Sequence, residues 1–137
     1  MKNTLRELEK FHGHLGPYVV LGYRMGQIAN NTLGKDAFSK KAIVWTGTKP
    51  PISCIIDGIQ ISSGCTLGKG NISIEQEGKP KAVFSDNNGK SIEILLKPDI
   101  QKEIDTTVTE ENMTNFSKMI FEKSNEDLFE IKNSLDL

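Results

Sequence analysis

The sequence is poor in the residues that carry most metal and redox chemistry. Its 137 residues include only two Cys, two His and one Trp. Two Cys cannot make a disulfide scaffold, and a chain of this length can bury a core without one. No apolar run approaches the roughly 20 residues that a membrane span requires, and the N-terminus has no apolar signal core. We therefore expect a single cytoplasmic domain over residues 1–137, with no membrane contact.

A surplus of either charge is also missing, because 17 basic residues face 18 acidic ones. Nucleic acid is excluded as an expected partner, since binding phosphates needs a basic surplus. The charge is nevertheless uneven. Residues 1–98 hold 13 basic and 8 acidic groups, whereas residues 99–137 hold 4 and 10. The sequence thus predicts a mildly basic body followed by an acidic C-terminal segment.

Apolar spacing and chain breakers predict an α+β fold with a mainly antiparallel sheet packed with helices. We expect helices at 4–10, 17–33 and 53–61, and strands at 42–45, 71–76, 81–85 and 91–97. Asn88-Gly89 indicates a hairpin between the last two strands. Gly22 and Gly26 share one side of the second helix, where they would admit another backbone.

The acidic segment predicts two further helices after an ambiguous stretch at 98–107. Thr109 is the expected cap of the first. Ser124, with Asp127 three residues later, resembles a capping box for the second. Apolar residues of that second helix would be Leu128, Phe129 and Ile131.

Both histidines lie in one tripeptide, His12-Gly13-His14. Two imidazoles can converge on a metal ion across a glycine, because glycine adopts unusual backbone dihedrals. The alternative is that one histidine caps the following helix and the other is exposed. The tripeptide alone leaves both interpretations open, since a metal site needs further ligands.

Cys54 is the candidate third ligand. If a helix begins at Ser53, the helix dipole and free N–H groups would stabilise a Cys54 thiolate, which is the form that binds metal. Asp57, three residues on, shares its face. Alternatively, Cys54 is a core residue and Asp57 a solvated carboxylate.

Cys65 follows Cys54 by eleven residues, or about 16 Å along an unbroken helix. Two thiolates on one zinc ion lie within about 5 Å of each other, so the same ion cannot take both unless the chain turns back or a second subunit contributes. A disulfide between them is excluded for the same reason. We expect Cys65 to lie behind the metal ligands or in a contact between subunits.

A glycine-rich stretch at 64–71 superficially resembles a phosphate loop, but its glycine spacing does not match one. An anion could still bind its backbone N–H groups together with Lys69 and Asn71. A tight turn into a strand explains the same residues equally well. Arg24 is a second candidate for attracting an anionic group.

These motifs together resemble the FmdE family, which is named after one of the subunits of formylmethanofuran dehydrogenase. The resemblance covers about residues 5–97. It rests on Phe11-His12-Gly13-His14-Leu15-Gly16-Pro17, Leu21-Gly22-Tyr23-Arg24, Cys54, Asp57-Gly58-Ile59-Gln60 and Gly64-Cys65-Thr66-Leu67-Gly68-Lys69-Gly70-Asn71. It implies a fold like the catalytic domain of glyceraldehyde-3-phosphate dehydrogenase, a divalent metal site that often holds zinc, and a homodimer.

Two departures from the family limit what the resemblance implies. Gly16 stands where many relatives have a cysteine, which removes a possible thiol ligand. The C-terminal zinc-binding module of longer relatives is also missing, since residues 99–137 contain no Cys. We therefore expect the core domain only, with acidic helices after it.

Three functions remain open from the sequence. The first is a metal-binding protein in which His12, His14 and Cys54 hold the ion and Asp57 orients a ligand or moves a proton. The second is a metal-free thiol enzyme that uses Cys54 as nucleophile and a histidine as base. The third is a non-catalytic subunit of formylmethanofuran dehydrogenase or another molybdenum or tungsten enzyme, docking through its acidic helices.

Overall fold

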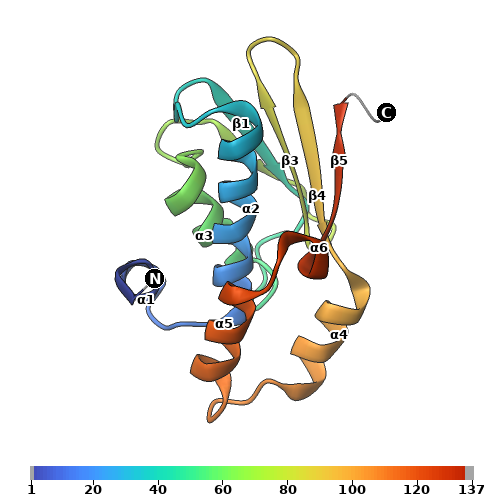
Figure 1. Cartoon of the computed structure of the whole chain (residues 1–137). Helices are drawn as coiled ribbons and strands as arrows, with labels where there is room; N and C mark the ends of the chain where they lie inside the picture. Colours follow the sequence, from blue (N-terminus) through green and yellow to red (C-terminus); the bar gives the residue numbers. More distant parts are fainter. Residues whose placement is uncertain (1, 135–137) are drawn as a thin grey trace.

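The computed structural model describes residues 2–134 and contains a five-stranded sheet in the order β2-β1-β3-β4-β5 (Figure 1). The strands are β1 (Lys40–Val44), β2 (Ile72–Ile74), β3 (Lys81–Asp86), β4 (Ser91–Leu96) and β5 (Phe129–Asn133). β1 and β2 are parallel, and the other three pairs are antiparallel. The predicted α+β class and mainly antiparallel sheet are confirmed.

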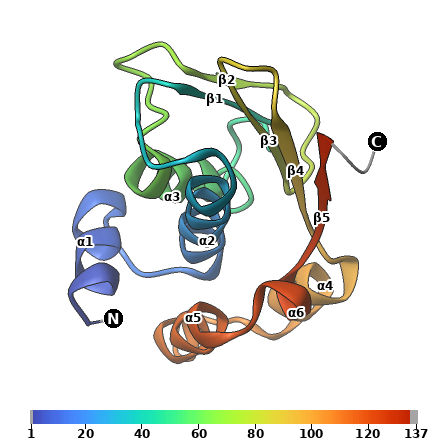
Figure 2. The same ribbon diagram turned by 45° about the horizontal axis from the view of Figure 1, so that its top comes forward.

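Helices cover one side of the sheet and one end of the molecule. They are α1 (Lys2–His12), α2 (Pro17–Leu33), α3 (Cys54–Ser63), α4 (Pro98–Thr107), α5 (Met113–Glu122) and α6 (Asn125–Leu128). Figure 2 shows α2 and α3 against the sheet, α1 outside them, and α4, α5 and α6 gathered at one end. The three predicted N-terminal helices and the β3–β4 hairpin are present at the expected positions.

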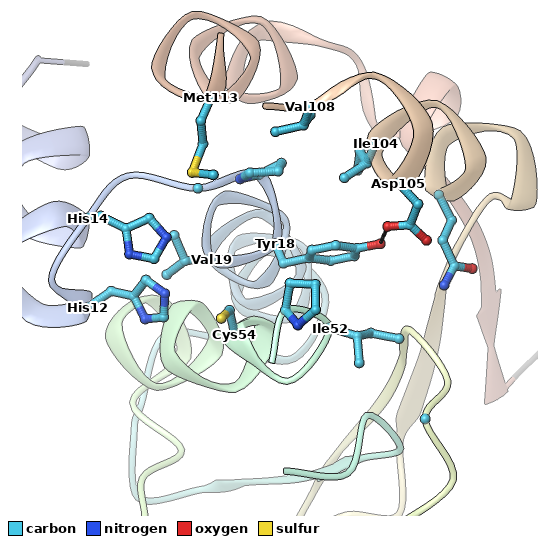
Figure 3. A pocket seen from close by; sticks show the side chains of 15 residues that line it. His12, His14, Tyr18, Val19, Ile52, Cys54, Ile104, Asp105, Val108 and Met113 are labelled. Carbon is cyan, nitrogen blue, oxygen red and sulfur yellow. Dashed lines mark hydrogen bonds between the residues drawn. The ribbon is translucent and has the colours of Figure 1, made fainter. Parts of the chain in front are cut away.

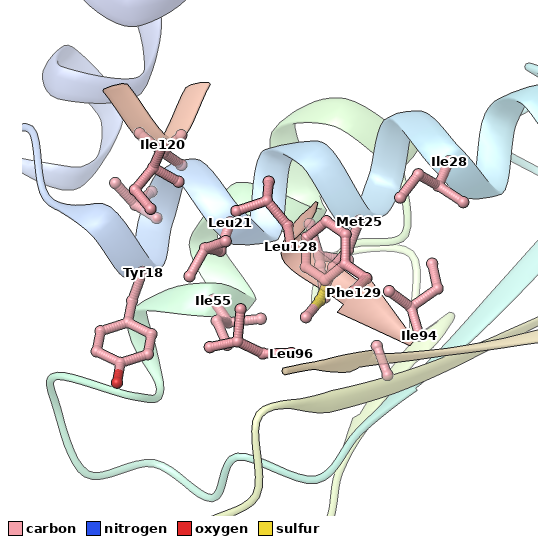
Figure 4. Packing of buried hydrophobic residues seen from close by; sticks show 14 of the residues in the cluster. Tyr18, Leu21, Met25, Ile28, Ile55, Ile94, Leu96, Ile120, Leu128 and Phe129 are labelled. Carbon is pink, nitrogen blue, oxygen red and sulfur yellow. The ribbon is translucent and has the colours of Figure 1, made fainter. Parts of the chain in front are cut away.

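The core lies between the sheet and α2. Alternate residues of each strand face it, as the period of a half-buried strand requires. Phe84 and Ile94 are fully buried on the sheet side, and Leu21 and Met25 are fully buried on α2 (Figure 4). The opposite face of the sheet carries partly exposed side chains such as Ile43.

Glycines bring α2 and α3 into backbone contact. A Cβ on Gly22 would lie 2.0 Å from the carbonyl oxygen of Ile55, and one on Gly58 would lie 2.0 Å from that of Val19. No side chain fits at such separations. The predicted close approach at Gly22 is confirmed, and it places the N-terminal ends of α2 and α3 side by side.

The prediction of a second C-terminal helix is correct for one turn and wrong beyond it. The Ser124 side chain accepts a hydrogen bond from the backbone N–H of Asp127, so the cap is real. The helix stops after four residues because Phe129 and Ile131 pair with Leu96 and Ile94 of β4. A period of two in Phe129-Glu130-Ile131-Lys132 matches a strand, and the added strand extends the sheet.

α5 lies where the first of the two C-terminal helices was predicted, and the ambiguous stretch at 98–107 is also helical. α4 occupies the ambiguous stretch and begins with Pro98 in its first turn, a position that tolerates the missing N–H. The predicted cap at Thr109 is one turn early, because Asn112 precedes the first residue of α5. Residues 135–137 of this segment lie outside the described residues.

Candidate functional site

The two histidines flank the junction between α1 and α2. His12 is the last residue of α1, and Gly13 turns the chain with a φ of +103°, a conformation that glycine adopts without strain. The ring centroids of His12 and His14 are 4.9 Å apart, with the planes tilted by 42°. The turn at this glycine places the two imidazoles next to each other.

Asp57 fixes the orientation of His12. Its carboxylate oxygen Oδ2 lies 2.5 Å from Nδ1 of the imidazole. The His12 side chain is 10% exposed and that of Asp57 35%, so the pair is partly shielded from water. An ionised carboxylate accepts a hydrogen bond from Nδ1–H of a neutral imidazole, and in that tautomer the lone pair of Nε2 is free. A carboxylate behind a histidine is the usual arrangement in which the histidine binds a metal.

Cys54 begins α3 beside the histidines. Its sulfur is turned toward the two imidazole rings, as Figure 3 shows. Burial raises the pKa of the Cys54 thiol, the nearby Asp57 carboxylate raises it further, and a backbone hydrogen bond opposes both. The expected stabilisation of a free thiolate by the helix N-terminus is therefore outweighed. The backbone N–H of Cys54 is already bonded to the Pro51 carbonyl.

The contact between α2 and α3 explains why these groups meet. The histidine loop enters α2 at Pro17, and α3 begins at Cys54. With Gly22 against Ile55, the two helices run side by side from this end. The local sequence thus sets the loop, and the interhelical glycine contact places the thiol next to it.

A cavity of about 580 Å³ opens beside the two histidines and Cys54. That volume is in the usual range for small-molecule sites. Apolar groups from α2, from the segment before α3, from α4 and from α5 make most of its wall. The labelled apolar residues in Figure 3 are Val19, Ile52, Ile104, Val108 and Met113.

The far end of the cavity is polar and was not foreseen from the sequence. Tyr18 donates a 2.7 Å hydrogen bond to a carboxylate oxygen of Asp105 on α4. Gln101, one turn earlier on the same helix, also lines the cavity. Desolvation by burial raises the pKa of the Tyr18 phenol, and Asp105 raises it further. The hydroxyl is therefore a neutral donor at physiological pH.

The donor chemistry of the site fits a divalent ion such as zinc. Imidazole nitrogen and cysteine sulfur are its common ligands, and the Asp57–His12 bond supplies the orienting carboxylate. Within residues 2–134, no group of three or more His, Cys, Asp or Glu side chains is assembled closely enough to hold an ion. His14 is exposed and makes no hydrogen bond to the described residues.

The other predicted site residues lie away from this cavity. Arg24 donates to the carbonyls of Ile120 and Phe121 and to the side-chain oxygen of Asn125. The guanidinium therefore satisfies backbone acceptors at the C-terminal end of α5 rather than standing free for an anion.

The glycine-rich loop is held by its own side chains. Asn71 donates to the carbonyls of Ala37 and Lys40 and accepts from the N–H of Thr66. Lys69 is exposed, donates to Thr66 and lies 5.5 Å from the ring centre of Phe38. These contacts match the tight-turn interpretation of this stretch.

Cys65 is fully buried by residues of this chain, beyond the C-terminal end of α3. Burial raises the pKa of its thiol, an effect that Ser63, Lys40 and Lys69 partly oppose. Both cysteines are free thiols, as the spacing argument predicted.

The fold and the cavity together define a small α+β protein with two imidazoles and a thiol at one end of an apolar pocket. Residues 11–133 match the family model FmdE, "Molybdenum formylmethanofuran dehydrogenase operon". The chain belongs to the FmdE family.

A solved structure shares the fold. It is a tungsten formylmethanofuran dehydrogenase FmdE-like protein from Syntrophus aciditrophicus. The two chains superpose with a TM-score of 0.73 at 22% identity, over 96% of this chain and 70% of the other.

A curated relative is named a probable S-adenosyl-L-methionine-binding protein from Archaeoglobus fulgidus. It is 35% identical over 81 residues, which are 58% of this chain. The match spans only 22% of that relative's length.

Among residues 2–134, no helix is both long and apolar enough to cross a membrane.

Proposed function

We propose that this chain is a metal-binding protein in which His12, His14 and Cys54 hold a divalent ion, zinc by the chemistry of the donors. The observation that carries the proposal is the 2.5 Å contact between His12 and Asp57 beside the second imidazole. A carboxylate in that position holds the tautomer whose free Nε2 can bind a metal. Water or a small molecule would complete the coordination.

The ion would supply a Lewis acid or a bound water of lowered pKa at one end of the cavity. The residues of the chain do the rest. Asp57 keeps the imidazole of His12 oriented, and its charge favours a cation at the adjacent nitrogen. The apolar wall and the half-buried position of Cys54 shield the thiol partly from water, which strengthens electrostatic interactions there.

The raised pKa of Cys54 leaves the metal-free thiol enzyme dependent on a histidine as the base. A nucleophile that acts at neutral pH needs a lowered pKa or a base within reach. Burial and Asp57 both act in the opposite direction on Cys54. A divalent cation reverses that balance, because a coordinated thiol is deprotonated outright. Homodimer formation and assembly with a molybdenum or tungsten enzyme stay predictions.

Metal analysis of the purified full chain tests the proposal. We expect about one zinc per chain in the wild type and loss of most of it in His14→Ala and Cys54→Ser. Cys65→Ala is the matched control, since it removes the other thiol and should keep the metal. Absence of bound metal in zinc-supplemented wild type, or full occupancy of both ligand variants, would overturn the proposal.

A further inference from the structure

The cavity has two polar ends of different chemistry, separated by an apolar middle. His12, His14 and Cys54 stand at one end, and Tyr18 and Asp105 at the other (Figure 3). The arrangement suits an elongated ligand with an apolar body and a polar group that reaches Asp105.

Asp105 is the negative charge at that far end. No Lys or Arg is among the described residues that line the cavity, and Asp105 forms no ion pair within residues 2–134. One of its oxygens accepts the Tyr18 hydroxyl, whereas the other accepts no hydrogen bond from the described residues. A carboxylate can accept about four hydrogen bonds, so most of its capacity faces solvent or a ligand.

Tyr18 holds this carboxylate in place. The tyrosine is 3% exposed, and its hydroxyl donates to Asp105 on α4, which is 87 residues away in the sequence. Burial and Asp105 raise the pKa of the phenol, so the hydroxyl is neutral at physiological pH and can donate to the carboxylate. A carboxylate whose one oxygen is anchored presents the other in a fixed direction, which lowers the entropy lost on binding a donor.

We propose that the cavity binds a small organic cation, an amine or amidine on an apolar body, with the cationic group on Asp105 and the body against Ile104, Val108 and Ile52. This inference deepens the proposed function by naming the class of ligand that the same cavity binds. It rests on the proposed function only for the metal chemistry at the end with His12, His14 and Cys54. An uncompensated carboxylate attracts a cation and repels an anion, and charge-assisted hydrogen bonds are the stronger kind.

Three simple aromatic probes test the ligand class. Benzylamine, benzyl alcohol and benzoate share one apolar body and differ in charge at the polar group. Each is titrated into the full chain and followed by amide chemical shifts in NMR. We expect benzylamine to bind tightest, with shifts at α4 and at the N-terminal end of α2. Failure of benzylamine to bind at millimolar concentration, or binding of benzoate as tight as that of benzylamine, would overturn the inference.

Two substitutions separate ligand binding from a purely structural tie between α2 and α4. Asp105→Asn keeps an acceptor for Tyr18 but removes the charge, and it should weaken benzylamine roughly five- to tenfold. Tyr18→Phe keeps the charge and should weaken it less. Glu103→Gln on the same helix is the control, because Glu103 is exposed and does not line the cavity. If Asp105→Asn and Glu103→Gln lost equal affinity for benzylamine, the effect would come from surface charge in general, and the inference would be contradicted.

The same titration in His14→Ala distinguishes this inference from the proposed function. Unchanged benzylamine binding in a variant without metal supports the far-end site independently. Metal in the wild type without any preference for the amine would overturn the inference alone. An amine preference in a wild type that binds no zinc would overturn the metal proposal alone.

Discussion

His12 and Asp57 are 45 residues apart in the sequence, yet Nδ1 of the imidazole lies 2.5 Å from the carboxylate. The contact joins the end of α1 to the first turn of α3. It orients one imidazole of the ambiguous His-Gly-His tripeptide, because the carboxylate determines which nitrogen of His12 carries the proton.

Removing the charge of Asp57 should weaken metal binding without removing a ligand. We expect Asp57→Asn to lower zinc affinity by about 10- to 100-fold, the usual effect of losing the carboxylate behind a metal-binding histidine. Competition with a chromogenic chelator measures the affinity. Asp99→Asn is the control, because Asp99 also lies in the first turn of a helix but does not line the cavity beside the histidines. Unchanged zinc affinity in Asp57→Asn would count against the role given to this carboxylate.

The pH dependence of Cys54 alkylation follows from its raised pKa. In chelator-treated protein, thiolate forms only above the ordinary range of a thiol, so iodoacetamide labelling should be slow at pH 7 and rise at higher pH than for a free thiol. Asp57→Asn removes one of the two causes of the raised pKa, the carboxylate charge, and leaves the burial. The increase in labelling rate should therefore occur at lower pH in this variant. Mass spectrometry of labelled peptides separates Cys54 from the fully buried Cys65. Fast labelling at pH 7 would instead favour the thiol-enzyme hypothesis.

The contact between α2 and α3 should be intolerant of a single methyl group. A Cβ at Gly22 would meet the carbonyl of Ile55 at 2.0 Å, so backbone must move in Gly22→Ala. We expect a loss of at least about 1–3 kcal/mol in the free energy of unfolding, measured by urea denaturation. Gly68→Ala is the matched control, because a Cβ there has nothing within 4 Å. Equal stability of the two variants would show that the helices separate easily.

Arg24 should act on stability rather than on ligand binding. Its guanidinium bonds two carbonyls at the end of α5 and the Asn125 side chain. Arg24→Ala should lower the free energy of unfolding by about 1–3 kcal/mol, since it leaves partly buried acceptors without a donor. Arg6→Ala, an exposed position on α1, should have little effect. A large loss of zinc or benzylamine binding in folded Arg24→Ala would contradict this prediction and would indicate that Arg24 contributes to the binding site.

The sequence was sufficient for the local parts of the fold. Gly13 between two histidines, Gly22 on α2 and the Asn88-Gly89 hairpin each predicted a backbone geometry that the chain adopts. Short-range patterns determine such features, since they depend on the dihedrals or side chain of one or two residues.

What the sequence did not predict depends on distant partners. Ser124 caps the short helix α6, and pairing with the edge of β4 makes the residues after α6 the strand β5. Asp105 carried no signal, because its role depends on Tyr18, 87 residues away, and on the position of α4. The sequence suggested that Arg24 could bind an anion, but it did not predict the hydrogen bonds of its guanidinium to the carbonyls at the end of α5. In each case the deciding neighbour belongs to another element, which no local pattern reports.

The coordination of zinc in the loaded protein tests the central claim most directly. The zinc K-edge absorption spectrum should contain one sulfur neighbour at about 2.3 Å together with nitrogen or oxygen neighbours at about 2.0–2.2 Å. The sulfur should disappear in Cys54→Ser and remain in Cys65→Ala. A spectrum without sulfur in the wild type, or one whose sulfur is lost only with Cys65, would contradict a metal centre built on His12, His14 and Cys54.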